Sequence, residues 1–123
     1  MADSKDIRMR ILLLDDNAAL AHVLALSLRV EGYFVVTCTS PHEALKNIHQ
    51  ADILVTDYHM PGMTGLEVAR EAYAQGWRGS LFIMSGRFSA IAERVEHPLL
   101  CSVLDKPFST RELVEKLRSC GKQ

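Results

Sequence analysis

Five short apolar runs alternate with amphipathic stretches along the sequence, and this alternation restricts the chain to few folds. The runs have the length of strands and lie at Ile11–Leu14, Tyr33–Val36, Ile53–Val55, Leu81–Met84 and Val103–Leu104. Strands that alternate with helical patterns indicate βαβ units around a parallel sheet. We therefore expect an α/β fold of five βα units, with helices on both faces of the sheet.

Three positions carry the signal of a helix start, in which Ser or Thr is followed three residues later by Glu. They are Ser40–Glu43, Thr64–Glu67 and Ser109–Glu112, and the first also has proline directly after the serine. Such pairs bind backbone N–H groups that the first turn of a helix leaves without partners. A helix is therefore predicted after each.

Two further helices are predicted with less complete signals. The first begins near Asn17 and ends at Gly32, and its apolar stripe is Leu20, Val23, Leu24 and Leu28. The other spans 89–96 and is cut short by Pro98. Together these segments complete five βα units without a linker or a repeat.

The composition excludes several classes of protein. The 123 residues are 48% apolar and 24% charged, which is typical of one globular domain. The formal net charge of −1 gives no reason to expect nucleic acid or anionic lipid as a partner. The apolar runs are too short to span a bilayer, and the first residues do not form a signal peptide.

The cysteines point to a reducing compartment. Cys38, Cys101 and Cys120 are odd in number and form no C-x-x-C pair, which favours free thiols in the cytosol over a disulfide framework. We therefore expect a cytoplasmic protein with reduced cysteines.

Acidic residues stand where two predicted strands end. Asp15 and Asp16 follow the first run, and Asp57 follows the third. In the flavodoxin-like strand order 2-1-3-4-5 these two strands are neighbours, and the ligand crevice lies between them. At an effective dielectric constant near 20, two charges about 4 Å apart repel by roughly 4 kcal/mol. A cation is therefore expected, and Mg²⁺ suits carboxylate ligands.

The last two strand ends add a hydroxyl and an ammonium group. Ser85 precedes Gly86 after the fourth run, and Lys106 precedes Pro107 after the fifth. A pocket with metal-binding acids, a nucleophilic carboxylate, a hydroxyl and a lysine is suited to phosphoryl transfer, which depends on positioning and charge neutralisation.

In order along the chain, these groups resemble the receiver domain of two-component response regulators, the CheY-like superfamily. The matching elements are Asp15-Asp16, the stretch DYHMPGMTG at 57–65, Ser85-Gly86 and Lys106-Pro107-Phe108. The likeness covers about residues 8–119. It implies a flavodoxin-like, doubly wound (βα)5 fold for residues 1–123 as a single receiver domain, with no output domain in this chain.

The resemblance also implies the chemistry. Asp57 would accept a phosphoryl group from a phosphohistidine on a sensor histidine kinase or a histidine phosphotransfer protein. Lys106 would pair with the phosphoryl oxygens, and Ser85 would donate a hydrogen bond to one of them. The surface formed by helix four, strand five and helix five would then change. The domain would be a signalling domain that catalyses only its own phosphorylation and dephosphorylation.

The metal site implied by the resemblance uses four groups. Asp16 and Asp57 would bind Mg²⁺ directly, Asp15 would act partly through water, and the backbone carbonyl of His59 would complete the protein ligands. The family often has an aromatic residue three positions before the lysine, where this sequence has Val103. Coupling between pocket and surface is therefore expected to be weaker or differently routed.

Two alternatives stay open at this point. One is a phosphorylation-independent interaction module with the same fold. The other is a phosphatase of the haloacid dehalogenase type, although the D-x-D pattern of those enzymes is absent, since Asp57-Tyr58-His59 stands there. The sequence does not decide between a stand-alone regulator and a receiver cut from a longer protein. It also leaves open the downstream partner, and whether the domain is a monomer or a phosphorylation-promoted dimer.

Overall fold

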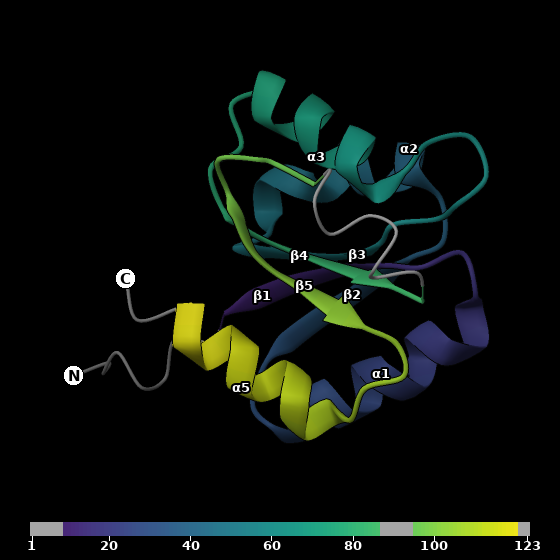
Figure 1. The fold of residues 1–123 in the computed structure, drawn as a ribbon, viewed down its shortest axis with the longest axis vertical. Coiled ribbons are helices and arrows are strands. Elements are labelled where there is room, and N and C mark those ends of the chain that lie inside the picture. Colours follow the sequence, from purple (N-terminus) through teal and green to yellow (C-terminus); the bar gives the residue numbers. More distant parts are fainter. Residues whose placement is uncertain (1–8, 87–94, 121–123) are drawn as a thin grey trace.

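A computed structural model describes residues 9–86 and 95–120 of the chain. Strands and helices alternate through these residues (Figure 1). The strands are β1 (Arg10–Leu14), β2 (Phe34–Cys38), β3 (Ile53–Asp57), β4 (Ser80–Ser85) and β5 (Leu100–Asp105). The helices are α1 (Ala18–Val30), α2 (Pro41–Asn47), α3 (Gly65–Ala74) and α5 (Thr110–Cys120), and a 3-10 turn (Ile48–Gln50) follows α2.

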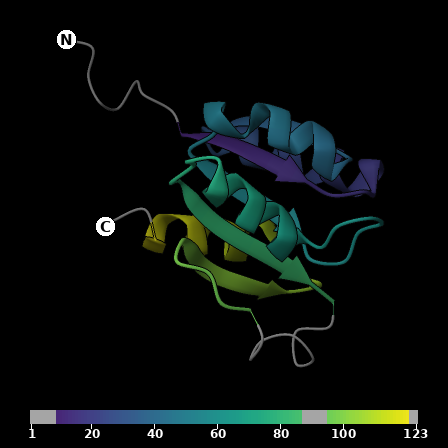
Figure 2. The ribbon, with the colours of Figure 1, turned by 90° about the horizontal axis from the view of Figure 1, so that it is seen from above.

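The five strands form one parallel sheet in the order β2-β1-β3-β4-β5. Figures 1 and 2 show that α2 and α3 cover one face of this sheet and that α1 and α5 cover the other. The predicted flavodoxin-like fold, its strand order and its helices on both faces are therefore confirmed.

Each face of the sheet has its own apolar core, because successive strand residues point to opposite faces. On β1, Leu12 and Leu14 pack towards α2 and α3, whereas Ile11 and Leu13 pack towards α1 and α5. All four are almost fully buried. Burial on both faces explains why β1 is a continuous apolar run rather than an alternating one.

The predicted helix starts are correct. The side chains of Thr64 and Ser109 each accept a hydrogen bond from the backbone N–H three residues later. The glutamate at that position in turn accepts a hydrogen bond from the backbone N–H of the Thr or Ser. Ser40 accepts from the N–H of Glu43 in the same way. Helix α1 is capped by Asn17, whose side chain accepts from the N–H of Leu20. These caps satisfy backbone N–H groups that would otherwise lack partners in the first turn of each helix.

Several strand boundaries differ from the predictions, most of all those of β2 and β5. Strand β2 begins at Phe34 and runs to Cys38, and β5 begins at Leu100 rather than at Val103. The extra residues at the end of β2 and at the start of β5 pair with the neighbouring strand through the backbone. They include polar or half-exposed residues, which an apolar pattern does not reveal. The helix predicted over 89–96 lies mostly outside the described residues.

The predicted apolar stripe of α1 is correct at Leu24 and Leu28, which pack against the core, and wrong at Leu20 and Val23. Leu28 is buried, but its buried companions are Ala21 and Ala25, whereas Leu20 and Val23 are 54% and 61% exposed. Small alanine side chains at these two positions allow the helix to lie close to the sheet, and Leu20 and Val23 are left on the outer side. The side of α1 that faces the core therefore combines two alanines with Leu24 and Leu28.

The prediction of three reduced cysteines is also wrong. Cys101 and Cys120 form a disulfide, and Cys38 is free and buried. The two partners are distant in sequence, but the last turn of α5 passes beside the start of β5. That proximity depends on how α5 packs against the sheet, so cysteine spacing could not reveal it. Over the described residues, no helix combines the length and apolar character needed to cross a membrane.

Candidate functional site

Asp57 is the last residue of β3, a central strand, and its side chain lies at the carboxyl edge of the sheet. The residue is only 8% exposed. Its strand has β1 on one side and β4 on the other, so the ends of all three strands meet at this edge. This is the edge at which open parallel sheets bind ligands.

Three carboxylates gather there. One oxygen from each of Asp15, Asp16 and Asp57 can be chosen so that all three lie within 4.8 Å of one another. Asp15 and Asp57 are buried, whereas Asp16 is exposed. Asp15 also accepts a hydrogen bond of 2.9 Å from the N–H of Asn17, the residue that caps α1. The cluster therefore consists of two buried carboxylates, Asp15 and Asp57, and one that faces solvent, Asp16.

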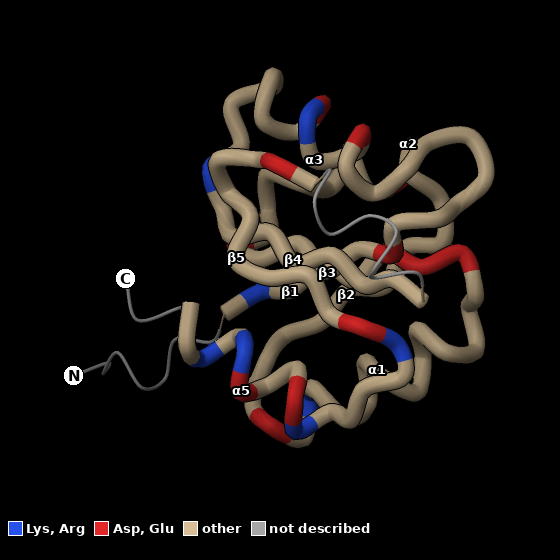
Figure 3. Tube along the Cα trace, viewed as in Figure 1, with Lys and Arg blue, Asp and Glu red and all other residues tan. Residues whose placement is uncertain are grey.

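Lys106 supplies positive charge to this cluster. Its Nζ lies 3.3 Å from Oδ1 of Asp57 and 3.7 Å from Oδ2 of Asp15. The lysine directly follows β5, and its backbone N–H donates to the carbonyl of Ser85 at the end of β4. Figure 3 shows acidic positions after β1 and an acidic and basic pair after β5. One ammonium thus contacts two of the three carboxylates.

The pKa of the Asp57 carboxyl is raised above its ordinary value. Burial is the largest cause, because it penalises the charged form. The ammonium of Lys106 lowers this pKa, and the charges of Asp15 and Asp16 raise it again. The net upward shift means that this environment, chiefly through burial, disfavours the charged form of Asp57. A second cation would stabilise that form.

Ser85 and His59 lie at the same edge. Ser85 is the last residue of β4 and is fully buried. His59 lies in the loop after β3, is exposed, and contacts the ring of Tyr58 edge to face. The structure therefore brings Asp15, Asp16, Asp57 and Lys106 together by measured contacts, and it places Ser85 and His59 at neighbouring strand ends.

Two residues hold the loop after β3, namely Gly65 of the predicted motif and Thr56, which the sequence did not single out. The hydroxyl of Thr56 donates to the backbone carbonyl of Asp57 at 3.0 Å. The N–H of Gly65 donates to the carbonyl of Tyr58 at 2.9 Å. A Cβ at Gly65 would overlap the carbonyl oxygen of Asp57. The glycine of the D-x-x-M-P-x-x-x-G motif therefore allows α3 to begin against the end of β3.

A mostly apolar cavity of about 500 Å³ adjoins the acidic cluster. Asp15 and Lys106 lie in its wall beside Leu20 and Val23 of α1 and Phe108 after β5. The exposed side of α1 thus continues from the reactive edge of the sheet. Sequence reasoning missed this surface because it assigned Leu20 and Val23 to the core.

Comparisons with known proteins agree with this arrangement. The family model described as "Response regulator receiver domain" matches residues 11–118. Transcriptional regulatory protein TctD of Salmonella typhimurium is 35% identical over 116 residues, which are 90% of this chain and 51% of TctD. Response regulator MprA of Mycobacterium leprae is 35% identical over 115 residues, or 90% of this chain and 50% of MprA. The chain spans about half the length of these curated relatives.

A solved structure has the same fold. The response regulator protein TrrA from Thermotoga maritima, in complex with Mg²⁺-BeF, superposes with a TM-score of 0.80 at 29% identity, covering 90% of this chain and 97% of TrrA. Fold, acidic edge and sequence similarity over nearly the whole length agree. The chain belongs to the response regulator receiver domain family, whose members are signalling domains of two-component systems rather than ordinary enzymes.

Proposed function

We propose that Asp57 accepts a phosphoryl group from a phosphohistidine on a sensor histidine kinase or a histidine phosphotransfer protein. The observation that carries this proposal is a buried carboxylate at a strand end, with the Lys106 ammonium 3.3 Å from one of its oxygens. A carboxylate oxygen of Asp57 forms the new bond to phosphorus as the bond between phosphorus and the imidazole nitrogen breaks. The imidazole keeps the electron pair and leaves as neutral histidine after taking up a proton.

Two residues would bind the transferred group. Lys106 already pairs with Asp57 and is held by its backbone bond to Ser85, so its ammonium is positioned to neutralise phosphoryl charge. The Ser85 hydroxyl, buried at the next strand end, would donate to a phosphoryl oxygen. Both residues would act by positioning the phosphoryl group and neutralising its charge, which is how most of the catalysis arises in other phosphoryl transfers.

The acidic cluster fits Mg²⁺ through its donor set. Three carboxylates within 4.8 Å of one another offer the hard oxygen ligands that this ion prefers. We propose that Asp15, Asp16, Asp57 and the backbone carbonyl of His59 hold it, with Asp15 partly through water. A bound Mg²⁺ would supply positive charge towards the phosphoryl oxygens. The relative TrrA, described in complex with Mg²⁺-BeF, supports this proposal.

The outer side of α1 suits a helical partner that presents the phosphohistidine. Arg29 is the only Lys, Arg, Asp or Glu in α1, and Figure 3 shows this helix almost without charge. Leu20 and Val23 are exposed on it and line the cavity beside Asp15 and Lys106. Apolar contact next to a polar reaction site is a common form of protein recognition.

Phosphorylation would be read out through the side of the sheet that carries β5 and α5. Val103 is half-buried and packs against the core beneath α2 and α3, in place of the aromatic residue that is common in the family. We therefore propose coupling that is weaker, or follows another route, than an inward-turning aromatic would give. We propose that residues 1–123 form a single receiver domain.

The first experiment is the intact mass after incubation with acetyl phosphate, a small acyl phosphate donor, and MgCl₂. We expect a gain of one phosphoryl group that is lost in Asp57→Asn and in EDTA. Asp105→Asn is the matched control, because this exposed acid ends β5 outside the acidic cluster and should leave the gain intact. A folded wild-type protein that gains no phosphoryl group would contradict the proposal and favour a phosphorylation-independent module.

A further inference from the structure

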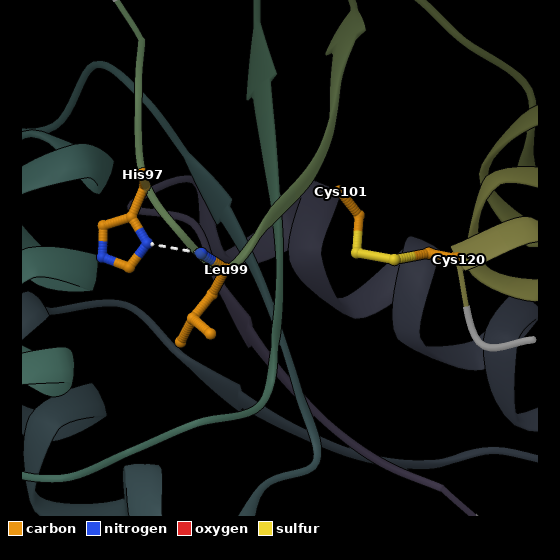
Figure 4. Close-up of a disulfide and its surroundings, with 4 residues drawn as sticks. All are labelled: His97, Leu99, Cys101 and Cys120. Atoms are coloured by element: carbon orange, nitrogen blue, oxygen red, sulfur yellow. Dashed lines mark hydrogen bonds between the residues drawn. A yellow bond between two sulfur atoms is a disulfide. The ribbon is translucent and has the colours of Figure 1, made fainter. Parts of the chain in front are cut away.

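The Cys101–Cys120 disulfide joins two elements at the edge of the sheet opposite to the acidic cluster. Cys101 is the second residue of β5 and Cys120 is the last residue of α5 (Figure 4). Their Cα atoms are 6.0 Å apart, within the range in which cysteines can be bridged. Lys106 follows the far end of the same strand, so the strand separates the sulfur bridge from the phosphorylation site.

The bridge is open to solvent on one side. Both cysteines are half-buried, and both line a surface cavity of about 580 Å³ between β5 and α5. Ser102 and Ser119 also line this cavity, which makes its wall more polar than that of the cavity beside the acidic cluster. A small polar molecule can therefore reach the sulfur atoms without unfolding the domain.

The charge beside the bridge favours thiolate chemistry. Among the described residues that line this cavity, Lys116 is the only charged one, and it lies one helical turn before Cys120 on α5. A nearby ammonium stabilises a thiolate, which is both the attacking and the leaving form in thiol–disulfide exchange. It also attracts the anionic carboxylates of a molecule such as glutathione.

Cys38 provides an internal contrast. It is 2% exposed, and burial raises the pKa of its thiol to about 11. A buried thiol in this state is a poor nucleophile and lies out of reach of small reagents. The chain thus holds one protected cysteine and one accessible pair.

We propose that Cys101 and Cys120 form a reversible thiol–disulfide exchange site for low-molecular-weight thiols and disulfides of the glutathione class. In the reducing direction, a thiolate attacks one sulfur, the bond between the cysteines breaks, and one cysteine leaves as a thiolate. A second thiolate then attacks the mixed disulfide, releases the other cysteine and departs as the reagent's own disulfide. Two electrons pass to the protein, and the protons of the two reagent thiols end on the two cysteines.

The bridge controls the attachment of α5. When it is closed, the last turn of α5 is covalently held at the start of β5. When it is open, that turn is held only by packing, chiefly through Leu117. The redox state of the pair therefore changes the local stability of α5 without altering the acidic cluster at the opposite edge.

The test is a redox titration of the full chain under native conditions. The protein is equilibrated in buffers of increasing ratio of glutathione disulfide to glutathione, quenched in acid and denaturant, alkylated with N-ethylmaleimide and weighed intact. We expect three alkyl groups in reducing buffers and one in oxidising buffers. In Cys38→Ala the number of alkyl groups should still fall by two between reducing and oxidising buffers. In the double variant Cys101→Ser/Cys120→Ser the number should not change between the buffers.

Several outcomes would overturn the proposal. One is a mass with three alkyl groups at every ratio of glutathione disulfide to glutathione. Another is a bridge that is reduced only when denaturant is present, and a third is the formation of glutathione adducts without the bond between Cys101 and Cys120. Hydrogen exchange of the two redox forms gives an independent measurement. We expect slower exchange in the oxidised form at the end of α5, and unchanged exchange in β3, whereas identical exchange in α5 would contradict the proposal.

Discussion

Gly65 lies against the backbone carbonyl oxygen of Asp57, so that no side chain can fit between them. A Cβ at position 65 would also approach Cγ2 of Thr56 at 2.9 Å, inside normal contact distance. The first residue of α3 and the last residue of β3 are therefore in direct backbone contact.

We predict that Gly65→Ala lowers the free energy of unfolding by about 1–3 kcal/mol, the usual cost of overpacking. Urea denaturation measures it. Gly86→Ala is the matched control, because a Cβ there meets nothing within 4 Å, and its effect should stay within about 0.5 kcal/mol. Equal stability of the two variants would contradict the prediction, because it would mean that the end of β3 and the start of α3 can move apart at little cost in free energy.

Magnesium should stabilise the folded protein, because the acidic cluster repels itself and an ion bound only by the folded state favours that state. At a free Mg²⁺ concentration about 100 times Kd, the gain is about 2.7 kcal/mol. Thermal denaturation with and without MgCl₂ should show a rise in Tm for wild type and for Asp105→Asn, and a smaller rise for Asp16→Asn. The same rise in all three would place the ion outside the cluster.

His97 should make stability depend on pH. Its Nδ1 accepts a hydrogen bond from the N–H of Leu99 (Figure 4), and its Nε2 lies 3.2 Å from the carbonyl of Ala69. The ring is therefore neutral, with its hydrogen on Nε2. Burial is the largest cause and lowers the pKa of His97 below the ordinary 6.5; the hydrogen bond with Ala69 raises this pKa in part, and the nearby charge of Arg70 lowers it.

Because the folded state holds fewer protons on His97 than the unfolded state, its contribution to stability is complete above pH 6.5. It is lost as the pH falls from there towards the lowered pKa. We predict that His97→Gln shows a smaller loss in free energy of unfolding than wild type between pH 7.5 and pH 5.5. His49→Gln is the control at an exposed histidine. Parallel pH profiles for wild type and His97→Gln would be inconsistent with a neutral His97 in the fold.

Reduction of the Cys101–Cys120 bridge should destabilise the domain. The bridge closes a loop with a sequence separation of 19 residues, for which chain entropy predicts roughly 3 kcal/mol. Urea denaturation of the oxidised and reduced protein measures the difference, and Cys101→Ser/Cys120→Ser should behave like the reduced form in both buffers. A difference that persists in this double variant would have another origin.

The outer side of α1 should matter for the partner and not for the chemistry. We predict that Val23→Ser slows phosphoryl transfer from a phosphorylated histidine phosphotransfer domain by about tenfold, or roughly 1.4 kcal/mol, the scale of an important interface residue. Phosphorylation by acetyl phosphate should be unchanged. Val30→Ser is the control, since Val30 is 84% exposed at the far end of the helix. An equal effect of the two variants would exclude docking at the cavity.

Much of the fold was predictable because each part depends on local chemistry. Capping residues mark where helices start, apolar runs mark strands buried on both faces, and Asp15, Asp57 and Lys106 each follow such a run. Once strands one and three are neighbours, the acids must meet at one edge. The family, the fold and the meeting of the candidate residues therefore follow from the sequence.

Other features depended on packing across the sheet. The closeness of α1 to the sheet selected Ala21 and Ala25 for the core and left Val23 exposed. The disulfide joins Cys101 to Cys120 because α5 ends beside the start of β5. Both features depend on contacts between residues of different elements. The periodicity of one segment does not predict its distance from another segment. The sequence by itself determined the elements and the chemistry at their ends, and only the tertiary structure decided which side of α1 is buried and which cysteines are joined.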